Sequence, residues 1–110
     1  MANTIKLIVF PVKDLDKAKT FYSTFLGVEP YVDGAYYVGY KVGDQEVGLD
    51  PNDQNVVSYI DVDDIERSLK ELETAGATVH MDVKNFGGGL LVAQIKDADG
   101  NILGLRQQSK

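Results

Sequence analysis

Few side chains in this sequence could carry covalent or metal chemistry. The 110 residues include one histidine, His80, and no cysteine. One imidazole cannot build a three-His zinc site or a two-His-one-carboxylate iron site from a single chain. The absence of cysteine excludes disulfides, thiolate nucleophiles, Cys-ligated zinc and iron–sulfur clusters. No serine lies in a nucleophile-elbow glycine pattern, so serine hydrolase chemistry has no support, while a hard metal held by oxygens stays open.

The remaining candidates are an acid–base group, an aromatic cluster and a glycine run. His80 could act as a general base near neutral pH, but a lone histidine is more often an ordinary strand residue. Tyr36 and Tyr40 share one face of a predicted strand and Tyr37 takes the other. This pattern favours a stacking platform for a flat ligand, or a cross-strand ladder or dimer surface. The glycines at 87–89 precede a strand and lack a following Lys-Ser or Lys-Thr, so they predict a mobile hairpin loop rather than a phosphate cradle.

Composition indicates one soluble globular domain. Hydrophobic residues make up 44 % and charged residues 25 %, which excludes intrinsic disorder. Eleven basic against 17 acidic residues leave a net charge of −6, which opposes nucleic-acid and anionic-membrane binding. No apolar run approaches the roughly 18 residues of a membrane span, and the start lacks signal-peptide features. We therefore expect a cytoplasmic protein with a small-molecule partner.

The first half of the chain predicts a strand, a helix and three further strands. Hydrophobic residues recur at helical spacing from Leu15, Asp14 can cap this helix, and Gly27 can end it in the left-handed conformation. The strands are expected at residues 5–12, 29–32, 36–42 and 45–49.

The second half repeats this order. A helical stripe runs from Ile65 to Ala75, with a capping box in which Asp63 caps and Glu66 reaches back, and Gly76 ends it. The strands are expected at residues 56–62, 78–83, 90–95 and 101–105.

The two halves align in a fixed register. Leu7 and Val57 are 50 positions apart, and after the glycine loop the offset becomes 56, which matches Gly48 with Gly104. A four-strand, one-helix unit cannot enclose a core alone, so the two copies should pack together. The predicted fold is α+β: one domain, 1–110, of two tandem βαβββ modules (about 1–52 and 53–110) with pseudo-twofold symmetry. We expect curved mixed sheets around a ligand cavity, with the helices outside.

Three segments within this order resemble the vicinal oxygen chelate superfamily of glyoxalase I, bleomycin resistance proteins and extradiol dioxygenases. They are residues 14–22, 25–28 and 97–105. Residues 42–49 and 99–107 look most like a bacterial group described only as related to lactoylglutathione lyase. The resemblance implies this βαβββ fold, a small-molecule ligand and a homodimer.

The resemblance also locates the positions that hold a metal ion in metal-dependent members, one on the first and fourth strand of each module. The matching positions are Leu7, Gly48, Val57 and Gly104. None has a side-chain lone pair, so the usual metal site is absent in this register. A shift of two residues in the fourth strand would place Glu46 or Asp50 there instead.

The family register places several side chains on the concave face. The predicted ligand contacts are Val9, Tyr40, Val57, Tyr59, Asp61, Phe86 and Arg106. Tyr59 would form an amphipathic wall and Arg106 a hydrogen-bond fork, and Phe86 would act as a flap in the glycine loop. Against this, strand tyrosines often serve packing, and a terminal arginine is usually solvated.

We therefore expect a metal-independent small-molecule-binding protein with no cofactor, like the bleomycin resistance proteins that the resemblance includes. One alternative is a metal-dependent lyase, isomerase or dioxygenase similar to lactoylglutathione lyase. The other is an interaction or regulatory module that binds no ligand.

Overall fold

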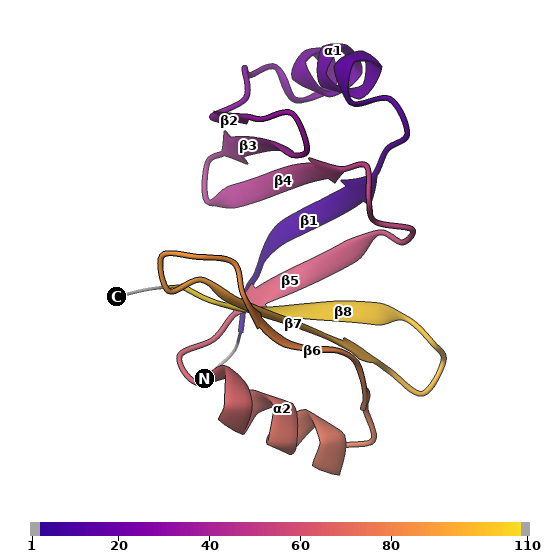
Figure 1. Ribbon diagram of the computed structural model, residues 1–110, viewed down its shortest axis with the longest axis vertical. Coiled ribbons are helices and arrows are strands. Elements are labelled where there is room, and N and C mark those ends of the chain that lie inside the picture. Colours follow the sequence, from indigo (N-terminus) through magenta and orange to yellow (C-terminus); the bar gives the residue numbers. More distant parts are fainter. Residues whose placement is uncertain (1–2, 109–110) are drawn as a thin grey trace. The chain divides into compact units, whose positions relative to one another are not determined.

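The computed structural model describes residues 3–108. The chain divides into two compact units, and the main boundary between residues 57 and 58 falls at the start of the fifth strand. Each unit carries one strand, one helix and three further strands (Figure 1), here named module one and module two. Neither helix of this part of the chain has the length and apolar character that crossing a membrane requires.

The elements follow the predicted order. Module one comprises β1 (Ile5–Pro11), α1 (Leu15–Leu26), β2 (Val32–Asp33), β3 (Val38–Val42) and β4 (Gln45–Asp50). Module two comprises β5 (Val57–Asp61), α2 (Ile65–Thr74), β6 (Thr78–Asn85), β7 (Leu91–Lys96) and β8 (Ile102–Gln107).

Strand pairing is equivalent in the two modules. In module one, β1 runs parallel to β4, and β3 joins β4 and β2 by antiparallel pairing. In module two, β5 runs parallel to β8, and β7 joins β8 and β6 in the same way. Val9 is opposite Gly48 and Tyr59 is opposite Gly104, which reproduces the sequence offsets of 59 − 9 = 50 and 104 − 48 = 56. The element order and the strand pairing confirm the predicted α+β architecture of two βαβββ modules.

Capping residues define where α1 begins and ends. The Asp14 carboxylate accepts the N–H of Lys17 at 3.1 Å, and Gly27 adopts φ 74°, as predicted for both residues. In α2 the predicted cap is wrong by one position, because Asp64, not Asp63, has the extended backbone and accepts the N–H of Arg67 at 3.2 Å. Side-chain capping reaches three residues forward, so the helix start at Ile65 selects Asp64.

Each helix covers one face of the strands of its own module. Beneath α1, a buried cluster of Val38, Tyr40 and Leu49 packs against Leu15, Tyr22 and other partly buried residues. Beneath α2, Ile65 and Leu69 pack on Ala93, Ile95 and Leu105. Because side chains alternate along a strand, the neighbours of Leu49 and Leu105, including Gly48 and Gly104, lie on the opposite faces.

The least accurate strand prediction concerns residues 29–37. Pro30 cannot donate a ladder hydrogen bond, and β2 is reduced to Val32–Asp33. The N–H of Gly34 donates to the Tyr37 carbonyl at 2.9 Å and closes a turn, so β3 begins at Val38 rather than at Tyr36.

Candidate functional site

The first-strand positions that the resemblance assigns to metal ligands are apolar and buried. Leu7 on β1 is 7 % exposed and Val57 on β5 is 1 % exposed. Leu7 lies opposite Glu46 on β4, two residues before Gly48. Neither aliphatic side chain can coordinate a metal ion or donate a hydrogen bond.

Gly104, the fourth-strand position of module two, lies directly against the ring of Tyr59 on β5. A methyl group in place of its α-hydrogen would meet Cγ of Tyr59 at 2.6 Å, and Cδ1 and Cε1 more closely still. Gln94 on β7 pairs with Gly104 from the other side, and its Nε2 donates to Tyr59 Oη at 2.8 Å. Tyr59 and Gln94 are 6 % and 8 % exposed, so glycine, ring and amide form one buried group.

Gly48, the fourth-strand position of module one, is also covered by a tyrosine ring. A methyl group at Gly48 would meet Cζ of Tyr37 at 2.7 Å and its hydroxyl more closely. The same ring lies across Gly39, the β3 partner of Gly48, with Cε2 at 3.3 Å from the corresponding position. Tyr31 covers Gly39 as well, at 3.4 Å through Cε1. The paired glycines Gly39 and Gly48 are therefore covered by two aromatic rings, those of Tyr37 and Tyr31.

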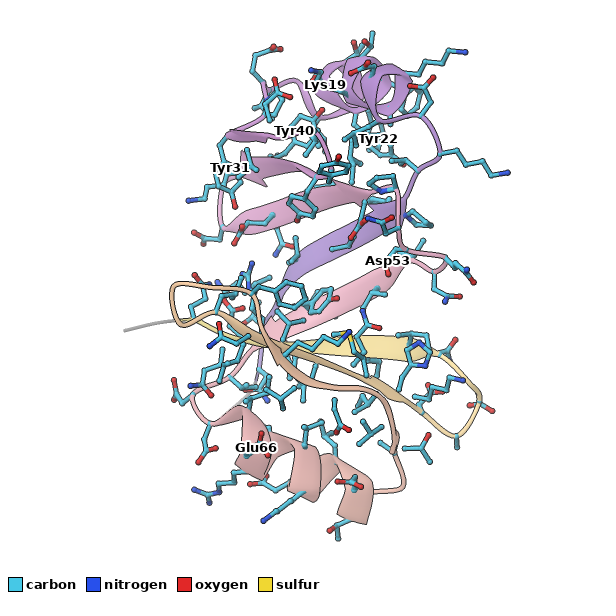
Figure 2. All side chains as sticks on the ribbon, viewed as in Figure 1. Lys19, Tyr22, Tyr31, Tyr40, Asp53 and Glu66 are labelled. Atoms are coloured by element: carbon cyan, nitrogen blue, oxygen red, sulfur yellow. The ribbon has the colours of Figure 1, made fainter. Side chains whose placement is uncertain are left out.

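The carboxylate of Glu46, two residues before Gly48, interacts within module one. Glu46 Oε1 accepts a hydrogen bond from Tyr31 Oη at 2.5 Å. Lys41, opposite Glu46 on β3, places its ammonium 4.6 Å from the centre of the Tyr31 ring. Figure 2 shows Tyr31 beside the strands of this module. The pairing of Val9 with Gly48 also keeps Gly48, rather than Glu46 or Asp50, equivalent to Gly104.

A second polar cluster joins the ends of β5 and β8. Arg106 lies opposite Asp61 and donates from Nε at 2.7 Å to Oδ1 and from Nη2 at 3.2 Å to Oδ2. Gln108 Nε2 also donates to Asp61 Oδ2, at 3.2 Å. Arg106 is only 8 % exposed. This bidentate geometry orients the guanidinium and offsets its charge, so its remaining N–H groups have fixed directions.

A shallow pocket of about 170 Å³ opens beside this cluster, lined by Asp61, Val62, Asp63, Gln107 and Gln108. Ligand cavities for drug-sized molecules usually exceed about 300 Å³, so this hollow fits only a small polar group. Gln107 Oε1 already accepts the N–H of Ile65 at 2.9 Å, so this part of the pocket lining stabilises the start of α2.

Tyr40 does not join these clusters. It is fully buried beneath α1, where its hydroxyl lies 2.9 Å from Ser23 Oγ and donates to the Lys19 carbonyl at 3.0 Å (Figure 2). These contacts assign Tyr40 a packing role in the core of module one.

The other predicted residues occupy varied surroundings. Val9 is 4 % exposed on β1, and Phe86 is 60 % exposed at the β6–β7 turn. His80 is exposed on β6, where the register with β7 shifts between Val79 and Met81. The structure brings Tyr59, Asp61 and Arg106 together on β5 and β8.

Sequence reasoning missed the partners that hold this region in place. Gln94 and Gln108 were not singled out, and Tyr37 was considered only as part of an aromatic strand. The available signal was the predicted register, because a residue that faces a strand glycine has room for a large ring.

Two titratable groups with shifted pKa values lie outside these clusters. The hydrogen bond from Lys19 to the Asp33 carboxylate raises the pKa of the Lys19 ammonium. Hydrogen bonds from Asn101, its side chain first, lower the pKa of the Asp97 carboxyl in the β7–β8 turn.

The model of the Glyoxalase/Bleomycin resistance protein/Dioxygenase superfamily matches residues 4–105. The chain belongs to this superfamily. No curated protein matches it.

Solved structures with the same fold have low sequence identity to this member of the superfamily. Hypothetical protein BH1468 from Bacillus halodurans C-125 has a TM-score of 0.82 and 15 % identity, over 100 % of this chain and 97 % of that one. A Streptomyces coelicolor methylmalonyl-CoA epimerase variant, in complex with 2-nitronate-propionyl-CoA, has a TM-score of 0.73 and 16 % identity, over 96 % and 97 %. The Mn(II)-bound glyoxalase from Novosphingobium aromaticivorans has a TM-score of 0.72 and 22 % identity, over 96 % of this chain and 40 % of that one.

The donor set does not fit the metal ion that some members of the superfamily hold. Two of the four expected positions are aliphatic, and the two glycines lie under tyrosine rings that a ligand side chain would have to displace. Within residues 3–108, no three His, Asp or Glu side chains gather in a group that could hold a metal. Leu7 and Val57 offer apolar packing at these positions instead, and the hydrogen bond beside Gly104 is made by Gln94 and Tyr59.

Proposed function

We propose that this protein binds a small organic molecule without a metal ion or a cofactor. The observation that carries the proposal is the set of residues at the four expected metal-ligand positions. Leu7 and Val57 have no donor atoms, and Gly48 and Gly104 are covered by the rings of Tyr37 and Tyr59. Superfamily enzymes that polarise their substrates at a metal depend on its charge, whereas binding needs only apolar walls and fixed polar groups.

The proposed ligand contacts are centred on module two. Tyr59 supplies an aromatic edge, and the paired Asp61 and Arg106 supply fixed hydrogen-bonding groups. Val9 and Val57 would add apolar wall, and Phe86 would close over the ligand from its exposed turn. Tyr40 is left out of this proposal because its ring packs in the buried cluster beneath α1. The net charge of −6 favours a neutral or cationic ligand.

We also propose that the two modules form one domain and that the protein works as a cytoplasmic homodimer. Sedimentation equilibrium of the full chain tests the dimer, which would be contradicted by a monomer at all concentrations.

Metal analysis tests the first half of the proposal. Protein purified without a histidine tag should contain less than about one tenth of an equivalent of nickel, zinc, iron or manganese. Treatment with a chelator should leave its melting temperature unchanged, because no bound ion contributes to folding. A stoichiometric ion would support the alternative of a metal-dependent lyase, isomerase or dioxygenase.

Ligand binding tests the second half. The chain has six tyrosines and no tryptophan, so quenching of tyrosine emission reports ligands near the aromatic groups. A panel of neutral and cationic metabolites should yield at least one that binds the wild type and binds Tyr59→Leu roughly 3- to 10-fold more weakly, because the aromatic edge is lost. Tyr36→Leu is the matched control, because Tyr36 is 78 % exposed. If no compound binds, the alternative of an interaction module gains support.

A further inference from the structure

Both fourth-strand glycines are covered by aromatic rings, but the rings come from different places. In module two the ring belongs to Tyr59, on the first strand, directly opposite Gly104. In module one the residue opposite Gly48 on the first strand is Val9, and the ring belongs to Tyr37, just before β3. The two modules therefore cover their fourth-strand glycines with tyrosines from positions that are not equivalent in the repeat.

We infer that Tyr37 and Tyr59 are specificity-determining residues that exclude metal-ligating side chains from positions 48 and 104. The ligand position in each module is thus closed by an interlocked pair of residues, one glycine and one tyrosine. Changing the glycine alone cannot restore a donor there, because the first side-chain atom would enter the ring.

The ring of Tyr59 has little freedom to move aside. Its hydroxyl accepts a hydrogen bond from Gln94 at 2.8 Å, and the residue is 6 % exposed. Extra atoms in a close-packed site force side chains out of their preferred rotamers or shift the backbone. A methyl group at Gly104 should therefore destabilise the protein, although alanine is otherwise no worse than glycine in a strand.

A double-mutant cycle in the full chain tests the pair in module two. Gly104→Ala should lower the melting temperature by roughly 5 °C or more in the wild-type background. In the Tyr59→Val background, which introduces the residue found at the equivalent Val9, the same change should cost less than about half as much. The inference is overturned if Gly104→Ala costs the same in both backgrounds.

The other module supplies the matched control. Gly48→Ala should also lower the melting temperature, and this loss should be unaltered by Tyr59→Val but relieved by Tyr37→Ala. If Gly104→Ala fails to fold, the Gly48 and Tyr37 cycle decides the inference by the same criterion. Equal coupling of Gly48 to Tyr59 and to Tyr37 would also overturn it.

A Co²⁺ titration connects the packing to metal exclusion. Val57→His/Gly104→Glu introduces two donors in module two, and we compare it with the same variant carrying Tyr59→Val. Co²⁺ should bind at least about tenfold more tightly when Tyr59 is replaced, as measured by the visible absorption of the bound ion. Equal affinity would overturn the inference. These outcomes are independent of the proposed ligand, because a wild-type protein that binds no small molecule would leave both cycles unchanged.

Discussion

The two modules share their strand order and register but differ in the side chains at both ends of their parallel strand pairs. At one end, module one pairs Pro11 with Asp50, whereas module two pairs Asp61 with Arg106. At the other end, module one has Glu46, held by Tyr31, and the residue at the equivalent offset in module two is Ile102. The repeat thus preserves backbone pairing, while polar chemistry is distributed differently in each copy.

This comparison shows why functional residues must be sought module by module. The equivalent positions 11 and 61 hold a proline and an aspartate, and only the second can orient an arginine. A residue role carried from one half to the other by register alone would be wrong at these positions.

The largest difference between the modules should appear on breaking the Arg106–Asp61 pair. Arg106→Ala should lower the free energy of unfolding by about 2–3 kcal/mol, because it leaves a partly buried carboxylate without its guanidinium partner. Urea unfolding at neutral pH measures this loss. Arg67→Ala is the control, since the Arg67–Glu71 pair is highly exposed and should contribute about 0–0.5 kcal/mol. Equal losses in the two variants would mean that the Arg106–Asp61 pair contributes no more than an exposed ion pair does.

The buried Tyr59–Gln94 contact should have the next largest effect. Tyr59→Phe keeps the ring over Gly104 but removes the acceptor for Gln94 Nε2, which should cost about 1–2 kcal/mol. The double variant Tyr59→Phe/Gln94→Leu should recover part of that loss, because no unpaired amide is left. Chemical denaturation of both variants provides the measurement. Module one has Gly39, which carries no side chain, at the position of Gln94. No recovery in the double variant would contradict the unpaired-amide explanation.

Much of the backbone could be predicted from the sequence because it depends on local and periodic signals. The sequence offsets of 50 and 56 predicted that Leu7 is equivalent to Val57 and Gly48 to Gly104, and the strand pairing of the two modules has the same offsets. Gly27 ends α1 as predicted. These signals are carried by single residues and their spacing.

The contacts of the candidate site could not be predicted in the same way. The position of Tyr37 depends on the late start of β3 at Val38, which residue propensities did not reveal. Gln94 matters only because β7 places it beside Gly104 and within reach of Tyr59. Such contacts join residues that are distant in sequence, so predicting them requires the pairing of the strands as well as the residue pattern of each strand.

Helix caps should be similar in the two modules and smaller in effect. Asp14→Ala and Asp64→Ala should each cost about 1 kcal/mol, because each carboxylate accepts an N–H in the first helical turn. Asp63→Ala should cost less than about 0.5 kcal/mol, since Asp63 is exposed and is not the cap. Thermal unfolding of the three variants distinguishes the two capping assignments in α2. A larger loss from Asp63→Ala than from Asp64→Ala would reverse the assignment.

The smallest expected effect is a local pH dependence that only module two should have. Asp97 accepts hydrogen bonds from the N–H groups of Asp99 and Asn101 and from the Asn101 side chain, whereas a two-residue turn connects β3 to β4. Its lowered pKa means that the folded turn favours the carboxylate. The stabilisation is therefore complete above the ordinary pKa of 3.8 and is lost as the pH falls through the lower folded value.

Hydrogen exchange at the Asn101 amide measures this dependence. After correction for intrinsic exchange, protection should fall below about pH 3.8 in the wild type, while Asp97→Asn should remove that dependence. The Gln45 amide, which follows the corresponding two-residue turn of module one, is the internal control. A parallel loss of protection at both amides would indicate global acid unfolding, and the difference between the turns would then not come from Asp97.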